Sequence, residues 1–348
     1  MAPTPTTYKR VVLSSRPSPT KLLDPAVFSL RHEPFPSPPG NGELLIKVLY
    51  LSLDPAMRSW INPSGSYMAP VPLGGTMRSF GLGVIISSDE GCKLKKGDRV
   101  QGFFGWTEYA LSPEKAATLL APPPPGAELL DYLGPLGPTG LTAYFGLTDI
   151  GQLKKGETLV VTGAAGATGS IVCQLGKLWG AKVFGIAGGT EKCQWLEREC
   201  GVEMAFDYKT EGWREEFKRV AGRFDVLFDN VGGKMLDFLL TRMNKRARIA
   251  VCGGISDYNS RPKGLTNYLA LINARARMEG FLIMDYAPRF AEGTRELARM
   301  LSRGELRRKF HVLKGVESAP EGLGMLFSGQ NTGKLVVQVG EETERGKL

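Results

Sequence analysis

The sequence contains few of the residues that bind metals or form disulfides. It has two histidines, His32 and His311, and five scattered cysteines, none of them in a CxxC pair. Because zinc sites need Cys, His or carboxylate ligands at short spacings, this pattern predicts no metal site. An odd number of cysteines favours free thiols in the cytosol over a secreted disulfide framework.

Long apolar runs are also missing. No stretch approaches the roughly 20 apolar residues of a membrane span, and no charged-then-apolar signal segment opens the chain. The sequence therefore predicts a cytoplasmic protein without membrane contact. The last three residues, 346–348, read GKL and differ from an SKL-type peroxisomal address in the first position, so that address stays open.

The charge is positive but dispersed. The formal net charge is +9, and the basic residues are interleaved with apolar ones instead of forming one stripe. This distribution suits anionic cofactors or substrates. Because no DNA- or RNA-binding motif accompanies the charge, no nucleic-acid partner is predicted.

The 348 residues exceed what a single core usually covers, so two domains are expected. Short strands and turns between residues 42 and 111 predict a small β barrel or sandwich, which ends at the proline-rich stretch 121–126 (APPPPG). Strands and helices then alternate, which predicts an α/β domain with a parallel sheet covered on both faces. The helices expected there are 137–147, 170–179, 191–200, 213–220, 234–243, 265–275 and 287–302, and the strands are 158–162, 181–187, 204–207, 224–230, 247–253 and 278–283.

The centre of this pattern is the stretch 158–180, TLVVTGAAGATGSIVCQLGKLWG. A β-branched strand meets three glycines and a helix follows, the arrangement of a phosphate-binding turn. Gly163 can adopt a backbone conformation closed to other residues, Gly166 lets the backbone approach a pyrophosphate, and Gly169 allows close packing of helix and strand. Free N–H groups at the helix start then face the phosphates. The turn residues expected at the cofactor are Gly163, Ala165, Gly166, Ala167, Thr168 and Gly169.

The end of the next strand indicates which dinucleotide binds. An NAD enzyme usually places Asp or Glu there to hold the ribose 2′-hydroxyl, but no acidic residue stands between Gly169 and Glu191. The strand instead runs through Gly188 to Lys192, whose charge would attract a 2′-phosphate. We therefore predict NADP, with a merely solvated Lys192 as the alternative.

Several short sequence motifs together resemble one family. They are YLSLDPAMR (50–58), GPTGLTAYFGL (137–147), AAGATG, GTEK (189–192), FDNVGG (228–233), CGGISDYN (252–259) and GQNTGK (329–334). The chain resembles the zinc-independent medium-chain dehydrogenases/reductases from about Tyr8 to Val339, in particular the NADP-dependent alkenal/one double-bond reductases (the leukotriene B4 12-hydroxydehydrogenase or prostaglandin reductase group). The resemblance implies a GroES-like β domain (1–128), a Rossmann domain (129–306), and a C-terminal segment (307–348) that returns to the first. It also implies a homodimer.

The resemblance assigns further cofactor residues. Lys192 and Tyr208 would contact the 2′-phosphate side of NADPH, and Asn331 would also reach the cofactor. Asn230, in a turn after a sheet strand, occupies the edge where open α/β sheets bind ligands. The phrase CGGISDYN adds Cys252, Gly253 and Tyr258. Tyr208 as a core residue and Asn331 as a turn residue are the structural alternatives.

The implied reaction is hydride addition to the β-carbon of an enal or enone, with a hydrogen-bond donor stabilising the enolate. Tyr258 is the first candidate donor and Tyr50 the second, although either could be an ordinary packed tyrosine. Ala56 departs from relatives that carry tyrosine there, which affects pocket shape. The alternative functions are that of a quinone reductase and that of a non-catalytic NADPH-binding protein.

Overall fold

The computed structural model describes residues 5–64 and 66–342, so the GKL ending lies outside the described residues. The chain forms two compact units. The first takes the described residues up to Pro122, His311–Gln330 and those from Leu335 onwards, and the second takes Pro123–Phe310 and Asn331–Lys334. The division proposed from the sequence, after residues 128 and 306, keeps 307–348 as one segment, whereas here Asn331–Lys334 groups with the second unit.

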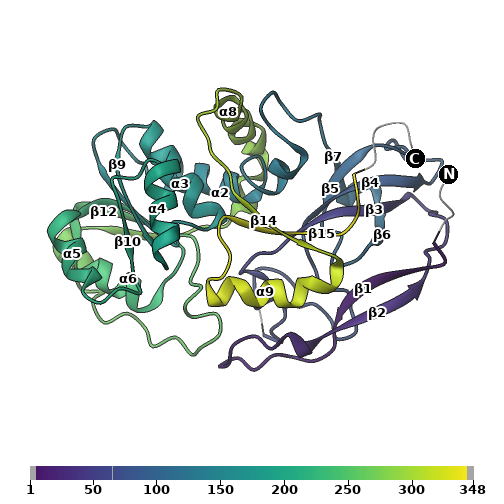
Figure 1. Cartoon of the computed structure of the whole chain (residues 1–348), viewed down its shortest axis with the longest axis horizontal. Coiled ribbons are helices and arrows are strands. Elements are labelled where there is room, and N and C mark those ends of the chain that lie inside the picture. The colour runs from purple at the N-terminus through teal and green to yellow at the C-terminus, as the bar shows by residue number, and fades with distance from the viewer. Residues whose placement is uncertain (1–4, 65, 343–348) are drawn as a thin grey trace. The chain divides into compact units, whose positions relative to one another are not determined.

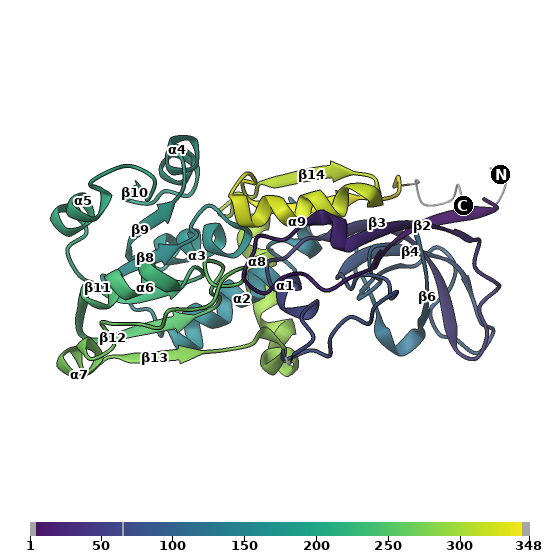
Figure 2. The same cartoon turned by 90° about the horizontal axis from the view of Figure 1, so that it is seen from below.

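The second unit is built on a six-stranded parallel sheet with the order β10-β9-β8-β11-β12-β13, which can be followed in Figure 2. The earliest strand, β8, lies inside the sheet, and the strand order reverses beside it. This is the strand order of a Rossmann fold, so that prediction is confirmed. The strands are β8 (Thr158–Thr162), β9 (Lys182–Ala187), β10 (Met204–Asp207), β11 (Phe224–Asp229), β12 (Met243–Val251) and β13 (Arg277–Gly280).

Helices cover this sheet and bury its strands. Leu159, Val160 and Val161 of β8 are fully buried, as expected for a parallel strand covered on both faces. The helix after the glycine turn packs against β8 and β9, while the two helices that follow β10 and β11 share a hydrophobic core with the sheet. The helices are α2 (Pro138–Phe145), α3 (Ala167–Leu178), α4 (Thr190–Glu199), α5 (Trp213–Val220), α6 (Gly233–Leu240), α7 (Ala270–Ala274) and α8 (Phe290–Ser302).

The first unit is an antiparallel β structure. Its seven-stranded sheet has the order β14-β15-β3-β4-β5-β7, with β6 also paired to β3, and a separate two-stranded sheet joins β1 and β2. Strand β15 comes from the C-terminal region and pairs with β3, as Figure 1 shows. The elements are β1 (Thr7–Leu13), β2 (Phe28–Pro34), β3 (Glu43–Ser52), α1 (Met57–Trp60), β4 (Gly81–Ser88), β5 (Arg99–Gly102), β6 (Tyr109–Pro113), β7 (Ala117–Leu119), β14 (Phe310–Lys314), α9 (Ala319–Ser328) and β15 (Lys334–Gln338).

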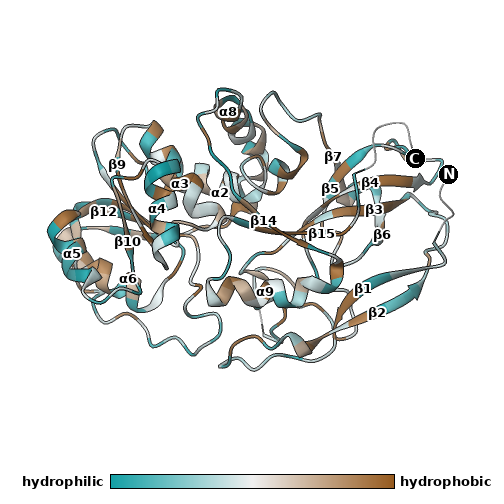
Figure 3. Ribbon diagram, in the orientation of Figure 1, coloured by the Kyte–Doolittle hydropathy of each residue, from teal (hydrophilic) through white to brown (hydrophobic). Residues whose placement is uncertain are grey.

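The hydropathy of these strands explains their placement. Strands β3, β4 and β15 are mostly apolar and lie within the sheet, whereas β2 is largely polar (Figure 3). Side chains of β3, α1, α9 and β15 form one hydrophobic core. The C-terminal segment therefore completes the β structure that the N-terminal residues begin.

The structure adds three elements that the sequence analysis did not place, and two expected helices have other bounds. Strand β2 lies within residues 14–39, and β14 and α9 lie within residues 309–334. The helix expected at 265–275 is only α7 (Ala270–Ala274). The helix expected at 287–302 begins at Phe290 instead, after a 3-10 turn that contains Pro288.

Candidate functional site

The glycine turn after β8 has the geometry that its sequence predicts. Gly163 has a φ of +58°, a region that favours glycine. A Cβ on Gly169 would lie 2.4 Å from the carbonyl oxygen of Gly163, so only glycine fits there. Helix α3 begins directly after Gly166 and has no side-chain cap. The amides of the turn that includes Ala165, Ala167 and Thr168 thus begin a helix, where an anion is favoured.

A second segment lies along this turn. The amide of Gly333 donates to the carbonyl of Ala165 at 2.9 Å, and Gly333 forms a parallel bridge with Gly166. Asn331 Nδ2 donates to the Gly333 carbonyl at 3.1 Å. The structure therefore brings Asn331 to the glycine turn. The two are far apart in sequence: the numbers of Asn331 and of Ser170, in the first turn of α3, differ by 161.

The carboxyl ends of β9 and β10 form the next part of the site. A Cβ on Gly188 would lie 2.8 Å from ring atoms of Tyr208, so the Tyr208 ring covers this glycine. Lys192, in the first turn of α4, is half-buried. Burial and then the charge of Lys209 lower the pKa of Lys192. Two lysines thus act on one region at the end of β9.

Strands β8 and β11 are joined at their carboxyl ends by a polar network. Thr162 Oγ1 donates to the Asp229 carboxylate at 2.6 Å and accepts from the Asn230 amide at 2.9 Å. Asn230 Nδ2 donates to the Thr162 carbonyl at 2.7 Å. Asp229 is completely buried, and this burial raises its pKa. The network fixes Asn230 at the sheet edge where ligands of such folds bind.

The turn after β12 packs on the turn after β11. Cys252 and Gly253 donate their amides to the Asp229 carbonyl at 2.8 and 3.2 Å. The Tyr258 hydroxyl accepts from the Gly254 amide at 3.3 Å. Burial raises the pKa of Tyr258, and the pKa of the Cys252 thiol is raised to about 12, also mainly by burial. Both groups therefore stay protonated at neutral pH.

Tyr50, the other donor candidate, belongs to the first unit. It lies on β3, is 7% exposed, and donates its hydroxyl proton to Glu342 at 3.1 Å. Its proton is therefore engaged by a carboxylate, whereas no described residue accepts the proton of Tyr258. This difference favours Tyr258 as a donor to a bound molecule.

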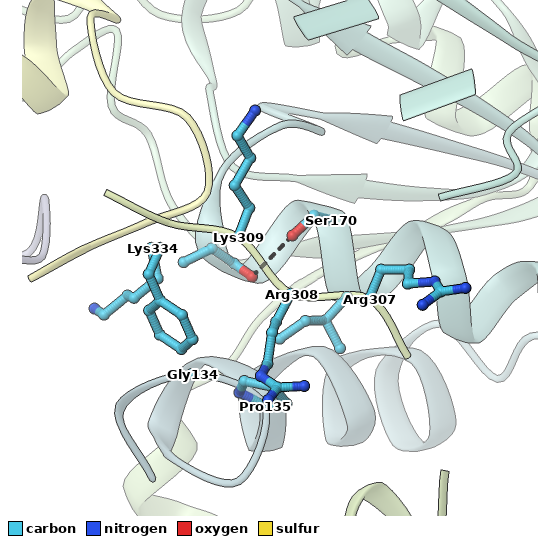
Figure 4. A pocket seen from close by; sticks show the side chains of 10 residues that line it. Gly134, Pro135, Ser170, Arg307, Arg308, Lys309 and Lys334 are labelled. Atoms are coloured by element: carbon cyan, nitrogen blue, oxygen red, sulfur yellow. Dashed lines mark hydrogen bonds between the residues drawn. The ribbon is translucent and has the colours of Figure 1, made fainter. Parts of the chain in front are cut away.

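A pocket beside α3 is lined by basic residues but does not form an anion site. Arg307, Arg308, Lys309 and Lys334 all contribute to its wall. Their side chains point in different directions (Figure 4), so their charges do not converge on one ligand. Arg308 instead pairs with Asp131, with its Nε 2.8 Å from Oδ1, although the N–H direction completes no hydrogen bond.

The sequence reasoning missed two residues near the cofactor edge. Lys209 directly follows Tyr208, which the resemblance assigns to the cofactor, in the segment Asp207-Tyr208-Lys209. Asp207 accepts hydrogen bonds from the amides of Gly189 and Lys209. A lysine pair on two different strand ends could have been found by noting that both ends meet at one sheet edge.

Two family models match the chain. An N-terminal domain of oxidoreductases matches residues 9–120, and a zinc-binding dehydrogenase model matches residues 167–301. Despite the name of the second model, within residues 5–64 and 66–342 no three His, Cys, Asp or Glu side chains gather so that they could hold a metal ion.

Relatives match over nearly the whole chain. The chain is 36% identical to the NADPH-dependent curcumin reductase of Escherichia coli, over 95% of this chain and 96% of the relative. It is 39% identical to the NADP-dependent 2-alkenal reductase of Nicotiana tabacum, over 88% of this chain and 90% of the relative. A crystal structure of CurA with NADPH from Vibrio vulnificus superposes with a TM-score of 0.90 at 36% identity, covering 96% of this chain and 100% of that one.

Proposed function

Because this chain belongs to the zinc-independent medium-chain dehydrogenases/reductases, in the group of NADP-dependent alkenal reductases, we propose that it reduces α,β-unsaturated aldehydes and ketones with NADPH. The product has a saturated bond in place of the C=C bond. The observation that carries this proposal is the 39% identity to a 2-alkenal reductase over 88% of the chain. This makes the chain an oxidoreductase that acts on a CH–CH group.

The residues at the sheet edge fit NADPH. A Cβ on Gly169 would clash with the Gly163 carbonyl, so glycine lets the turn pack closely on α3, and this helix starts without a side-chain cap, which leaves its N-terminus suited to an anion. Lys192 supplies a positive charge where an NAD enzyme would have a carboxylate. When bound, NADPH supplies the hydride that adds to the substrate β-carbon. We propose that Gly163, Ala165, Gly166, Ala167, Thr168, Gly169, Gly188, Lys192, Tyr208, Asn230, Cys252, Gly253, Tyr258 and Asn331 hold it.

The polar groups of the chain have distinct roles in this proposal. The Tyr258 hydroxyl donates a hydrogen bond to the substrate carbonyl oxygen as negative charge develops on it. The Gly254 amide donates to the same hydroxyl and thereby strengthens it as a donor. Asp229 and Thr162 hold Asn230 in place. Tyr50 is the weaker candidate because its proton is donated to Glu342.

We also propose a homodimer in the cytosol. Strand β13 is an edge strand that carries Met278, 37% exposed, and the helix α7 that precedes it in the chain carries Ile272, 70% exposed, after Leu269, 56% exposed. A second copy would cover this edge. Free cysteines are consistent with a reducing compartment. Among the described residues, no helix combines the length and apolar character needed to cross a bilayer.

The test is NADPH oxidation with a medium-chain 2-alkenal and with a benzylidene-type enone, each repeated with NADH and with a quinone. We expect turnover of the alkenal and the enone with NADPH and little with NADH. Quinone turnover without enone reduction would favour the rival quinone reductase. Tight NADPH binding without any turnover would favour a non-catalytic role.

A further inference from the structure

The turns that follow β9 and β10 are tied together by one carboxylate. Asp207, at the end of β10, accepts from the Gly189 amide at 2.9 Å and from the Lys209 amide at 3.0 Å, both through Oδ1. Gly189 is the residue before α4 and has a φ of +107°, a conformation that favours glycine. The carboxylate therefore fixes the start of the helix that carries Lys192 relative to the backbone of Lys209.

The two lysines on these turns influence each other. The charge of Lys209 lowers the pKa of Lys192, after the larger effect of burial. Lys209 itself is exposed and forms no ion pair with any described residue. Two like charges held near each other repel, and a shared anion would relieve that repulsion. Tyr208, the residue before Lys209, covers Gly188 at the end of β9 with its ring.

We propose that Lys209 is a second residue that selects NADPH over NADH, and that Asp207 positions it beside Lys192 through the two amides it binds. The proposal rests on NADPH being the cofactor. The 2′-phosphate would then meet two cations from the ends of two neighbouring strands. Lys209 acts as a specificity-determining residue, and Asp207 as a positioning residue that does not touch the phosphate.

A carboxylate this close to a phosphate would normally weaken its binding. At Asp207 the Oδ1 atom already accepts two backbone N–H groups, whose dipoles offset part of its charge. Removing the charge while keeping an oxygen acceptor should therefore preserve the arrangement, whereas removing the side chain should release it. These two substitutions separate the positioning role from a charge effect.

The experiment is calorimetric binding of 2′,5′-ADP and of 5′-AMP to the full-length protein, because these probes differ by the 2′-phosphate alone. We expect Lys209→Ala to weaken 2′,5′-ADP about tenfold, the size of a charge-assisted hydrogen bond, and to leave 5′-AMP unchanged. The control is Lys245→Ala. It removes an exposed lysine near the amino end of β12, whereas Lys209 follows the carboxyl end of β10. It should change neither affinity.

Asp207→Asn should bind 2′,5′-ADP at least as well as the parent protein, and Asp207→Ala should lose affinity for it. The proposal is overturned if Lys209→Ala weakens both probes equally, if it matches Lys245→Ala, or if Asp207→Ala binds like the parent. The binding assay needs no enone substrate. A protein that binds 2′,5′-ADP through Lys209 but reduces no enone would contradict the proposed reaction and leave this inference intact.

Discussion

The hydroxyl of Thr162 donates a 2.6 Å hydrogen bond to the buried carboxylate of Asp229. The two residues end the neighbouring parallel strands β8 and β11, and Asn230 continues from the second of them. Because a buried carboxylate without hydrogen-bond donors is costly, the Thr162 hydroxyl stabilises Asp229 in the protein interior. The same contact lies at the edge of the sheet where we propose that the cofactor binds.

Thr162→Val should destabilise the fold because it keeps the shape but removes the donor to Asp229. A buried acceptor that loses its partner costs about 1–3 kcal/mol. Thr241→Val is the control: its hydroxyl donates to a helix carbonyl at an exposed site, where a change of about 0.5 kcal/mol or less is expected. Urea unfolding of both variants measures the difference, and equal effects would contradict the role given to Thr162.

Lys192→Ala should weaken NADPH binding about tenfold or more and change NADH binding little, since a charge-assisted contact to the 2′-phosphate is lost. Quenching of tryptophan fluorescence by each cofactor gives the two affinities. Lys245→Ala serves as the control for a lost positive charge. An equal loss for both cofactors would show that Lys192 does not recognise the 2′-phosphate.

Tyr258→Phe should slow hydride transfer far more than it lowers NADPH affinity, because it keeps the ring at the cofactor and removes only the hydroxyl that is expected to act on the developing enolate. Single-turnover kinetics with an alkenal separate this step from binding. Since burial raises the pKa of Tyr258, the parent rate should not fall between pH 7 and pH 9 through loss of this proton. The exposed Tyr268→Phe is the control; an unaltered rate in Tyr258→Phe would shift the role to Tyr50 or a cofactor hydroxyl.

Asp131 should make stability depend on pH. Burial raises its pKa from 3.8 to about 6, against the attraction of Arg308 and the bond from the Glu128 amide. A raised carboxyl pKa means that the folded state holds the proton more tightly, so this contribution is complete below pH 4 and is lost as pH rises to about 6. Relative to Asp131→Asn, the parent should lose about 3 kcal/mol between these limits. Urea denaturation of both proteins at pH 4 and at pH 7 measures this change. The same stability difference between parent and Asp131→Asn at the two pH values would disprove the prediction.

Ile272→Glu should convert the proposed dimer into a monomer. Ile272 is 70% exposed on α7, the helix that precedes the edge strand β13 in the chain, and a charge there cannot be buried against a second copy without a large desolvation penalty. Sedimentation velocity measures the change. Leu111→Glu, at an exposed leucine of the first unit, is the control. A parent protein that sediments as a monomer would refute the dimer itself.

The sequence was most informative where local pattern and burial agree. Strand β8 and the glycines after it were placed correctly because a β-branched run, a turn and a helix leave few alternatives. The strands β10 and β11 and the helix α5 also lie close to their expected bounds.

Prediction from the sequence failed where side chains at distant positions determine the local backbone conformation. The helix expected from residue 265 starts only at Ala270, because Asp237 binds the amides and side chains of Thr266 and Asn267. That contact spans about thirty residues and leaves no periodic signal. Likewise, nothing in the local sequence shows that Gly333 pairs with Gly166.

The hydrogen bond from Gly333 to Ala165 has a consequence for how the protein is made. The Rossmann strands β8 to β13 are all synthesised by residue 280, yet the glycine turn receives this partner only after residue 333 has been added. During translation the glycine turn can therefore acquire this backbone partner only after every strand and helix of the nucleotide-binding unit has been made. A ribosome-bound chain stopped at residue 320 should capture a dinucleotide poorly, and about fifteen further residues should restore capture once they clear the exit tunnel.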